Sequence, residues 1–166
     1  MKIKTSYFYQ IRNFKENMIP VSTAIWDPKW YHDNRGHSYI YEDKRGIING
    51  IRLEALITQA QGCGLCPCED KNPNTCAFLK SYQEQLEKID FNKMINDMQN
   101  FADSYQQYKG FKEEPIIVLI VYETPQNKCS ERIALQNYFR SHGFDCQELE
   151  YPINSLEPIK NEPFEF

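Results

Sequence analysis

One uninterrupted apolar run constrains the fold of this chain more than any other feature. The run Ile116-Ile117-Val118-Leu119-Ile120-Val121-Tyr122 is apolar at every position before its closing tyrosine. A strand with one face in water alternates apolar and polar residues, and this segment does not. The run therefore predicts a strand that is buried on both faces, lies in the centre of its sheet and runs parallel to its neighbours.

The segment after this run has the pattern of a helix followed by another strand. Cys129-Ser130-Glu131-Arg132 opens a helix that reaches His142, and Gly143 ends it. Phe144 to Leu149 then has the composition of a last strand. Strand, helix and strand over about 35 residues form a βαβ unit, which is right-handed by the usual rule.

The other segments complete a single α/β domain over residues 1–166. Strands are predicted over Ile3–Tyr9 and Ile19–Trp26, with Pro20 near the start of the second, where a proline is tolerated. Helical spacing of apolar residues begins near Thr75, and Asp90 can cap a further helix that ends at Gly110. We expect a mostly parallel sheet flanked by helices, with a cysteine-rich loop inserted before the helical stretch.

Four clustered cysteines predict a metal site in that loop, which covers residues 58–77. The spacing is C-x2-C-x-C-x7-C, and the ligands would be Cys63, Cys66, Cys68 and Cys76. Four thiolates suit a closed tetrahedral zinc site, which would be structural and would not itself catalyse a reaction. An iron–sulfur cluster is the alternative metal group, although standard ferredoxin spacings differ from this one. Free thiols or disulfides are the remaining alternative.

Composition limits the partners and the compartment. The formal net charge of −4 disfavours binding to nucleic acid, although a chain of this charge can still carry a local basic patch. No segment approaches the roughly 20 apolar residues of a membrane helix, and the first residues lack the apolar run of a signal peptide. We therefore expect a cytoplasmic protein, in which cysteines are more often ligands or nucleophiles than disulfide partners. Residues 152–166 have the composition of an irregular, acidic tail.

The turn after the central apolar run is the predicted chemical site. Ligands of open α/β sheets bind at the carboxyl ends of the strands, and helix N-termini favour anions. Cys129 lies at such a helix start, where its thiolate fraction would rise. Arg132 would then hold a phosphate or carboxylate, and Glu123 would act as a general base or bind a ribose hydroxyl. The alternative is that Cys129 or Ser130 only caps the helix, with Glu131 and Arg132 in solvent.

A tryptophan-rich loop follows the second predicted strand. Trp26 and Trp30 lie there with other aromatic and basic residues, which would suit base stacking or the wall of a small-molecule pocket. Parallel strands would bring this loop to the same sheet edge as the Cys129 turn. The alternative is that both tryptophans anchor the loop to the core.

The two ends of the chain resemble the domain of unknown function 488 family. The similarity rests on Lys4-Thr5-Ser6-Tyr7-Phe8 and on the segment from Val118 to Glu123 followed by Cys129-Ser130-Glu131-Arg132. In that family a strand ends in Cys-x-Glu, and Cys-His-Arg opens the next helix. Here the strand cysteine is Val121, the histidine is Ser130 and the arginine is displaced to Arg132, so that Glu123 and Cys129 are the matching positions. The resemblance implies a fold more than an activity.

Three functions follow from these patterns. The first is a binding module with a small anionic-ligand or nucleotide pocket near Cys129 and a structural zinc site. The second is a thiol enzyme that uses Cys129 as nucleophile, Glu123 as base and Arg132 as anion clamp. The third is an interaction protein without a small-molecule site, whose acidic tail would be the contact.

Overall fold

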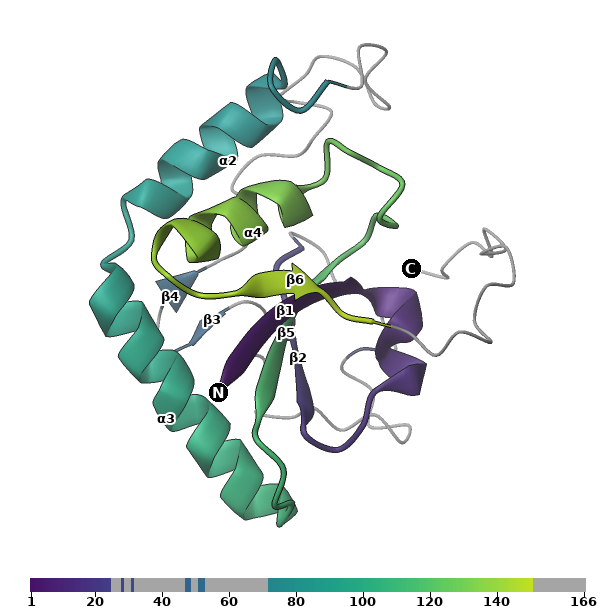
Figure 1. Cartoon of the computed structure of the whole chain (residues 1–166), viewed down its shortest axis with the longest axis vertical. Coiled ribbons are helices and arrows are strands. Elements are labelled where there is room, and N and C mark those ends of the chain that lie inside the picture. The colour runs from purple at the N-terminus through teal and green to yellow at the C-terminus, as the bar shows by residue number, and fades with distance from the viewer. Residues whose placement is uncertain (25–27, 29–30, 32–46, 49–50, 53–71, 151–166) are drawn as a thin grey trace.

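The computed structural model describes residues 1–24, 28, 31, 47–48, 51–52 and 72–150 of the chain. Its main sheet has four parallel strands in the order β2-β5-β1-β6, as Figure 1 shows. These strands are β1 (Lys2–Tyr7), β2 (Met18–Ser22), β5 (Ile116–Val121) and β6 (Cys146–Glu148). A separate antiparallel pair consists of β3 (Ile47–Ile48) and β4 (Ile51–Arg52). The parallel sheet with its helices confirms the predicted α/β fold.

The apolar run is confirmed as a central strand. β5 pairs with β1 on one side and with β2 on the other. Its residues alternate between two cores, because successive side chains of a strand point to opposite faces. Ile117, Leu119 and Val121 belong to the first core, whereas Val118 and Ile120 belong to the second. Burial on both faces explains why no polar residue interrupts the run.

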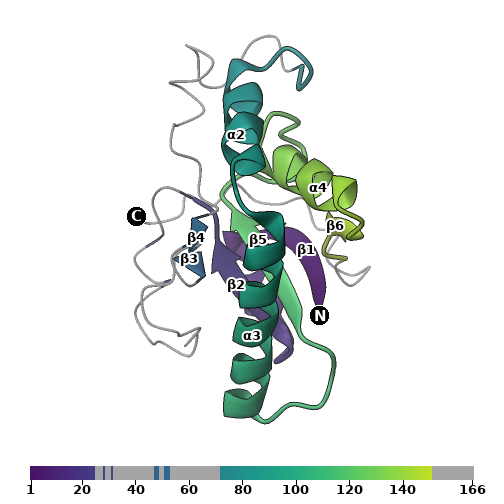
Figure 2. The ribbon, with the colours of Figure 1, turned by 90° about the vertical axis from the view of Figure 1, so that its left-hand side faces the viewer.

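Three α-helices pack on the first core, which lies on one face of the sheet. They are α2 (Ala77–Glu87), α3 (Phe91–Lys109) and α4 (Glu131–Ser141), and Figure 2 shows them from the side. The Asp90 side chain accepts a hydrogen bond from the backbone N–H of Lys93 at 3.1 Å and caps α3, as predicted. Gly110 ends α3 with a φ of 77°, a conformation that glycine adopts without strain.

The opposite face of the sheet is covered by a short 3₁₀ helix, η1 (Phe8–Asn13). The first strand was predicted to continue to Tyr9, but it ends at Tyr7, because the chain turns there and buries Phe8 and Ile11 in the second core. The second strand is also shorter than predicted: β2 ends at Ser22.

The last strand is shorter than predicted as well: β6 pairs with β1 through Cys146 to Glu148, and in the described part of the chain it is the edge strand of the sheet. β1 therefore lies between β5 and β6 in the sheet, and the β5–α4–β6 connection crosses over it. This crossover brings residues of β1, of the turn after β5 and of the end of β6 beneath the start of α4.

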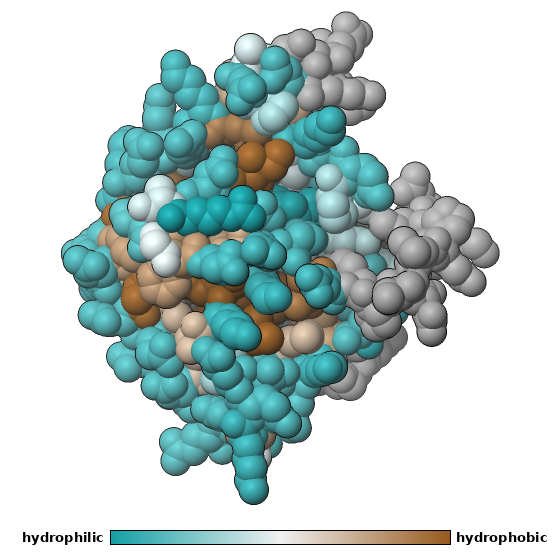
Figure 3. Space-filling view, in the orientation of Figure 1, coloured by the Kyte–Doolittle hydropathy of each residue, from teal (hydrophilic) through white to brown (hydrophobic). Residues whose placement is uncertain are grey.

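The described surface offers few exposed apolar side chains. Figure 3 shows a mostly hydrophilic face with an apolar band across its middle. Within the described ranges, Tyr108 is the large apolar side chain that is exposed, at 74%. None of the helices in these ranges has both the length and the apolar character needed to span a membrane.

Candidate functional site

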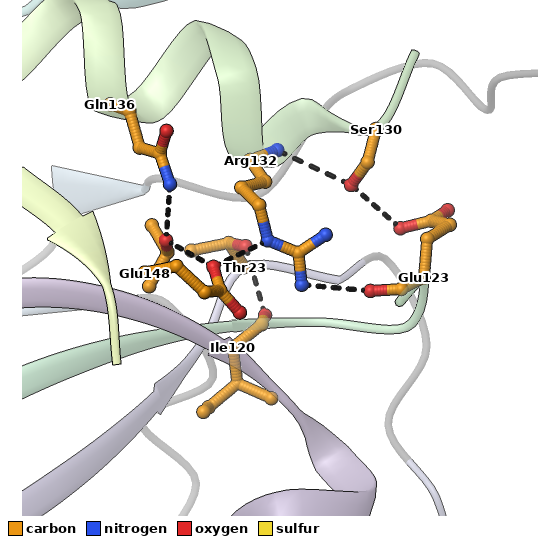
Figure 4. Close-up of polar contacts among 8 residues, drawn as sticks. Thr23, Ile120, Glu123, Ser130, Arg132, Gln136 and Glu148 are labelled. Carbon is orange, nitrogen blue, oxygen red and sulfur yellow. Dashed lines mark hydrogen bonds and ion pairs between the residues drawn. The ribbon is translucent and has the colours of Figure 1, made fainter. Parts of the chain in front are cut away.

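Polar side chains gather where α4 begins above the sheet. They come from β1, from the turn after β5, from the first two turns of α4 and from the end of β6. We call this group the Arg132 cluster; its members are Thr5, Glu123, Ser130, Glu131, Arg132, Gln136 and Glu148. Most of its contacts are visible in Figure 4. The cluster lies at the predicted place, near the carboxyl edge of the parallel strands.

Ser130 begins the helix and connects it to the turn after β5. Its hydroxyl oxygen accepts a hydrogen bond from the backbone N–H of Arg132 at 3.3 Å, which is an N-cap. The same hydroxyl donates to Oε2 of Glu123 at 3.0 Å. The prediction that a residue at this point caps the helix is therefore confirmed for Ser130. Glu131 and Arg132, which a simple cap would leave in solvent, are instead buried.

Arg132 is the centre of the cluster, and it is only 4% exposed. Its Nε donates to Oε2 of Glu148 at 2.7 Å, and its Nη2 donates to the backbone carbonyl of Glu123 at 2.9 Å. The guanidinium carbon also lies 5.9 Å from the ring centre of Tyr7. The remaining nitrogen, Nη1, is buried and has no hydrogen-bond partner in the described part of the chain. Figure 4 shows this nitrogen on the side of the guanidinium away from Glu148.

Thr5 connects the cluster to the middle of the sheet. Thr5 lies opposite Leu119 of β5, so it shares the face that α4 covers. Its hydroxyl donates to Oε2 of Glu148 at 2.7 Å and accepts from Nε2 of Gln136 at 2.7 Å. A buried polar residue in an otherwise apolar row is thereby satisfied. Oε2 of Glu148 thus receives bonds from both Thr5 and Arg132.

Burial favours the neutral form of two acidic groups in the cluster, Glu131 and Glu148. The pKa of Glu131 is raised well above the ordinary carboxyl range, first by burial and then by the charge of Glu123. Burial also raises the pKa of Glu148, against the opposing effects of Arg132 and Thr5. The 2.7 Å ion pair with Arg132 nevertheless requires an ionised Glu148, whose side chain is 24% exposed, and we take the ion pair as the dominant state.

Cys129 does not lie at an accessible surface. It is 3% exposed and belongs to the first core, together with residues of α2 and α4 such as Phe78 and Leu135. The expectation that its thiol lines a solvent-accessible pocket is therefore not met. A nucleophile has to reach its substrate, so this burial argues against the thiol-enzyme hypothesis in the state that the structure shows.

Most of the other predicted site residues lie outside the described ranges. These are Trp26, Trp30, Cys63, Cys66 and Cys68. Tyr31, which follows Trp30, packs in the second core and therefore on the face opposite α4. Cys76 is described: it is buried, belongs to the first core and occupies the N-cap position of α2. Among the described residues, no group of three or more His, Cys, Asp or Glu side chains is arranged to hold a metal ion.

Comparisons with models of known protein families, with curated proteins and with solved structures gave no match. The resemblance to the domain of unknown function 488 family therefore stays a prediction from the two ends of the sequence.

Sequence reasoning identified Glu123 and Arg132 but missed the groups that hold them. Thr5, Gln136 and Glu148 come from three different elements and meet only when β6 pairs with β1. One signal was available in advance: Thr5 interrupts the apolar positions Ile3 and Tyr7 on one face of its strand. A polar residue in such a row has to find a buried partner.

We predict that replacing Arg132 with methionine destabilises the protein by about 2–4 kcal/mol, because Glu148 and the carbonyl of Glu123 lose their charged donor. Arg140→Met is the matched control on the same helix, since Arg140 is exposed, and its cost should stay below about 1 kcal/mol. Urea unfolding of the two variants measures the difference. Equal, small losses of unfolding free energy in the two variants would show that the hydrogen bonds of Arg132 do not stabilise the fold.

Proposed function

We propose that this protein binds a small oxyanion, such as a phosphate or a carboxylate, with Arg132 as the principal donor. The observation that carries the proposal is the buried Nη1 of Arg132, which no group in the described ranges bonds. Buried polar atoms in folded proteins are nearly always hydrogen-bonded, so an unpartnered one calls for an acceptor. A guanidinium nitrogen is positively charged and only donates, and it is best satisfied by an anionic oxygen.

The position of Arg132 in the fold supports the same ligand class. It lies in the first turn of α4, a helix of 11 residues whose N-terminus carries partial positive charge. It also lies near the carboxyl edge of a parallel sheet, where open α/β folds bind their ligands. A nucleotide would present a phosphate to the same donor. The loop predicted to stack its base contains Trp26 and Trp30, which lie outside the described residues. Support for nucleotide binding therefore comes from Arg132 alone.

The carboxylates of the cluster oppose anion binding and set its strength. Glu123, Glu131 and Glu148 surround a single cation. The raised pKa of Glu131 removes part of this repulsion, because a protonated carboxyl group carries no charge. One charge-assisted bond and one helix terminus then leave an affinity on the order of millimolar. We infer that a free oxyanion is bound weakly, and that an oxyanion group of a larger ligand is bound through further contacts of that ligand as well.

Phosphate titration tests this proposal. In ¹H–¹⁵N spectra of the wild-type protein, we expect the backbone amides of residues 130–133 to shift saturably at millimolar phosphate, with sodium chloride at equal ionic strength as the reference. Arg132→Lys should abolish the saturable shift, because lysine keeps the charge but lacks the forked donors. Arg140→Lys, at an exposed position, should leave it unchanged. A linear response, or the same response in Arg132→Lys, would exclude Arg132 as the binding group.

We further propose that Cys63, Cys66, Cys68 and Cys76 bind a structural zinc ion. The support is the spacing of the four cysteines together with the place of Cys76 at the N-cap of α2. The N-terminus of a helix favours negative charge, so a thiolate ligand suits that place. Zinc would then fasten the inserted loop to the start of α2. An iron–sulfur cluster is the alternative, and a reducing cytoplasm suits both because it keeps thiols reduced.

Elemental analysis of purified protein should find about one zinc per chain. Cys66→Ser should lose the metal and lower the unfolding temperature, since a structural zinc contributes folding free energy. Cys146→Ala is the control, because Cys146 lies in β6 and is not part of the spacing pattern, and its zinc content should be unchanged. A colourless protein with neither zinc nor iron would contradict the proposal, and a brown, iron-containing protein would assign the site to an iron–sulfur cluster.

A further inference from the structure

The hydroxyl groups of the Arg132 cluster have no proton left for a ligand. The Ser130 hydroxyl accepts a hydrogen bond from a backbone N–H of α4, and its single proton goes to Oε2 of Glu123 at 3.0 Å. The Thr5 hydroxyl accepts from a side-chain amide of α4 at 2.7 Å, so its proton goes to Oε2 of Glu148, also at 2.7 Å. An oxyanion at this place therefore depends on Nη1 of Arg132, which no described group bonds, and not on these hydroxyls.

The guanidinium offers such a ligand one nitrogen and not its fork of Nε and Nη2. A fork of two parallel N–H groups can hold two oxygens of an oxyanion at once. In Arg132 this fork is already divided between Glu148 and the backbone carbonyl of Glu123, at 2.7 and 2.9 Å. Figure 4 shows Nη1 turned to the side on which Ser130 lies. Hydrogen-bond geometry therefore gives little basis for a choice between planar and tetrahedral oxyanions, and the choice depends on charge.

The charges of the cluster leave a negative surplus. Arg132 supplies one positive charge, whereas Glu148 is ion-paired with it and Glu123 accepts the bond from Ser130. Glu131 is 7% exposed and precedes Arg132 in the helix, and a carboxyl group is either neutral or negative, so it cannot offset the surplus. The helix N-terminus contributes only about half a positive charge. One cation thus faces two carboxylates before any ligand arrives.

We propose that the Arg132 cluster selects a singly charged oxyanion, such as a carboxylate, over a dianion such as sulfate. The inference rests on the proposed function and adds the class of ligand to it. The second negative charge of a dianion is repelled by the surplus, and it raises the cost of taking the ion out of water, which grows with the square of the charge. A phosphate monoester, with a charge of about −1.5 to −2 near neutral pH, is disfavoured for the same reason.

Three anions separate the effect of charge from that of shape. Methanesulfonate and sulfate share a tetrahedral head but carry one and two negative charges, and acetate is a planar monoanion. In ¹H–¹⁵N spectra of the wild-type protein near neutral pH and at constant ionic strength, we expect the amides of residues 130–133 to shift saturably with acetate and with methanesulfonate. The dissociation constant of sulfate should be about fivefold to tenfold higher than that of methanesulfonate.

The possible failures of this titration are distinguishable. Sulfate that binds as tightly as methanesulfonate would overturn the inference and leave the proposed function standing. If none of the three anions gives a saturable shift, the proposed function is wrong, and the inference fails with it.

Removal of one carboxylate charge should weaken the preference. Glu123→Gln keeps an acceptor for the Ser130 hydroxyl but removes a negative charge. We expect the ratio of the sulfate to the methanesulfonate dissociation constant to fall by about threefold in this variant. Glu84→Gln removes a charge from an exposed position of α2 and should keep the wild-type ratio. An unchanged ratio in Glu123→Gln, or an equal fall in both variants, would overturn the inference; if Glu123→Gln does not fold, the wild-type comparison decides.

Discussion

The arrangement of this protein around its α4 helix depends on one buried guanidinium. Arg132 lies on the first turn of α4, yet its two bonds reach Glu148 at the end of β6 and the carbonyl of Glu123 beyond β5. Thr5 of β1 joins the same carboxylate. Arg132 thus ties the helix directly to the end of β6 and to the turn after β5, and through Glu148 to β1. A shift of the helix on the sheet would break these bonds. Such a shift is disfavoured because it would leave a buried charge without partners, which is costly.

The same arrangement explains why the thiol of Cys129 is buried while carboxyl and guanidinium groups gather at the start of α4. With α4 held down by Arg132 and covered by α2, Cys129 becomes part of the apolar core. At the helix start, the hydroxyl of Ser130 bonds to the carboxylate of Glu123, and Glu131 is buried. The buried guanidinium nitrogen of Arg132 that no described group bonds is the feature of this packing on which the proposed function rests.

The elements whose pattern is local were predictable from the sequence, and the contacts across elements were not. The apolar run of β5, the Asp90 cap and the glycine stop at Gly110 each depend on neighbouring residues, and the structure confirms all three. The burial of Arg132 depends on Glu148, which is 16 residues away and arrives only through the pairing of β6 with β1. Periodicity cannot reveal such a pairing, so the ion pair that buries Arg132 could not be predicted from the sequence.

The central claim is that the third donor of Arg132 is an anion-binding group. A crystal structure of the wild-type protein, grown near neutral pH in phosphate and compared with Arg132→Lys under the same conditions, tests it most directly. The account predicts a phosphate oxygen within hydrogen-bond distance of Nη1 in the wild type, with Nε still bonded to Glu148, and no phosphate at this place in the variant. A wild-type structure in which Nη1 bonds to a group of the protein itself, with no anion nearby, would contradict the account.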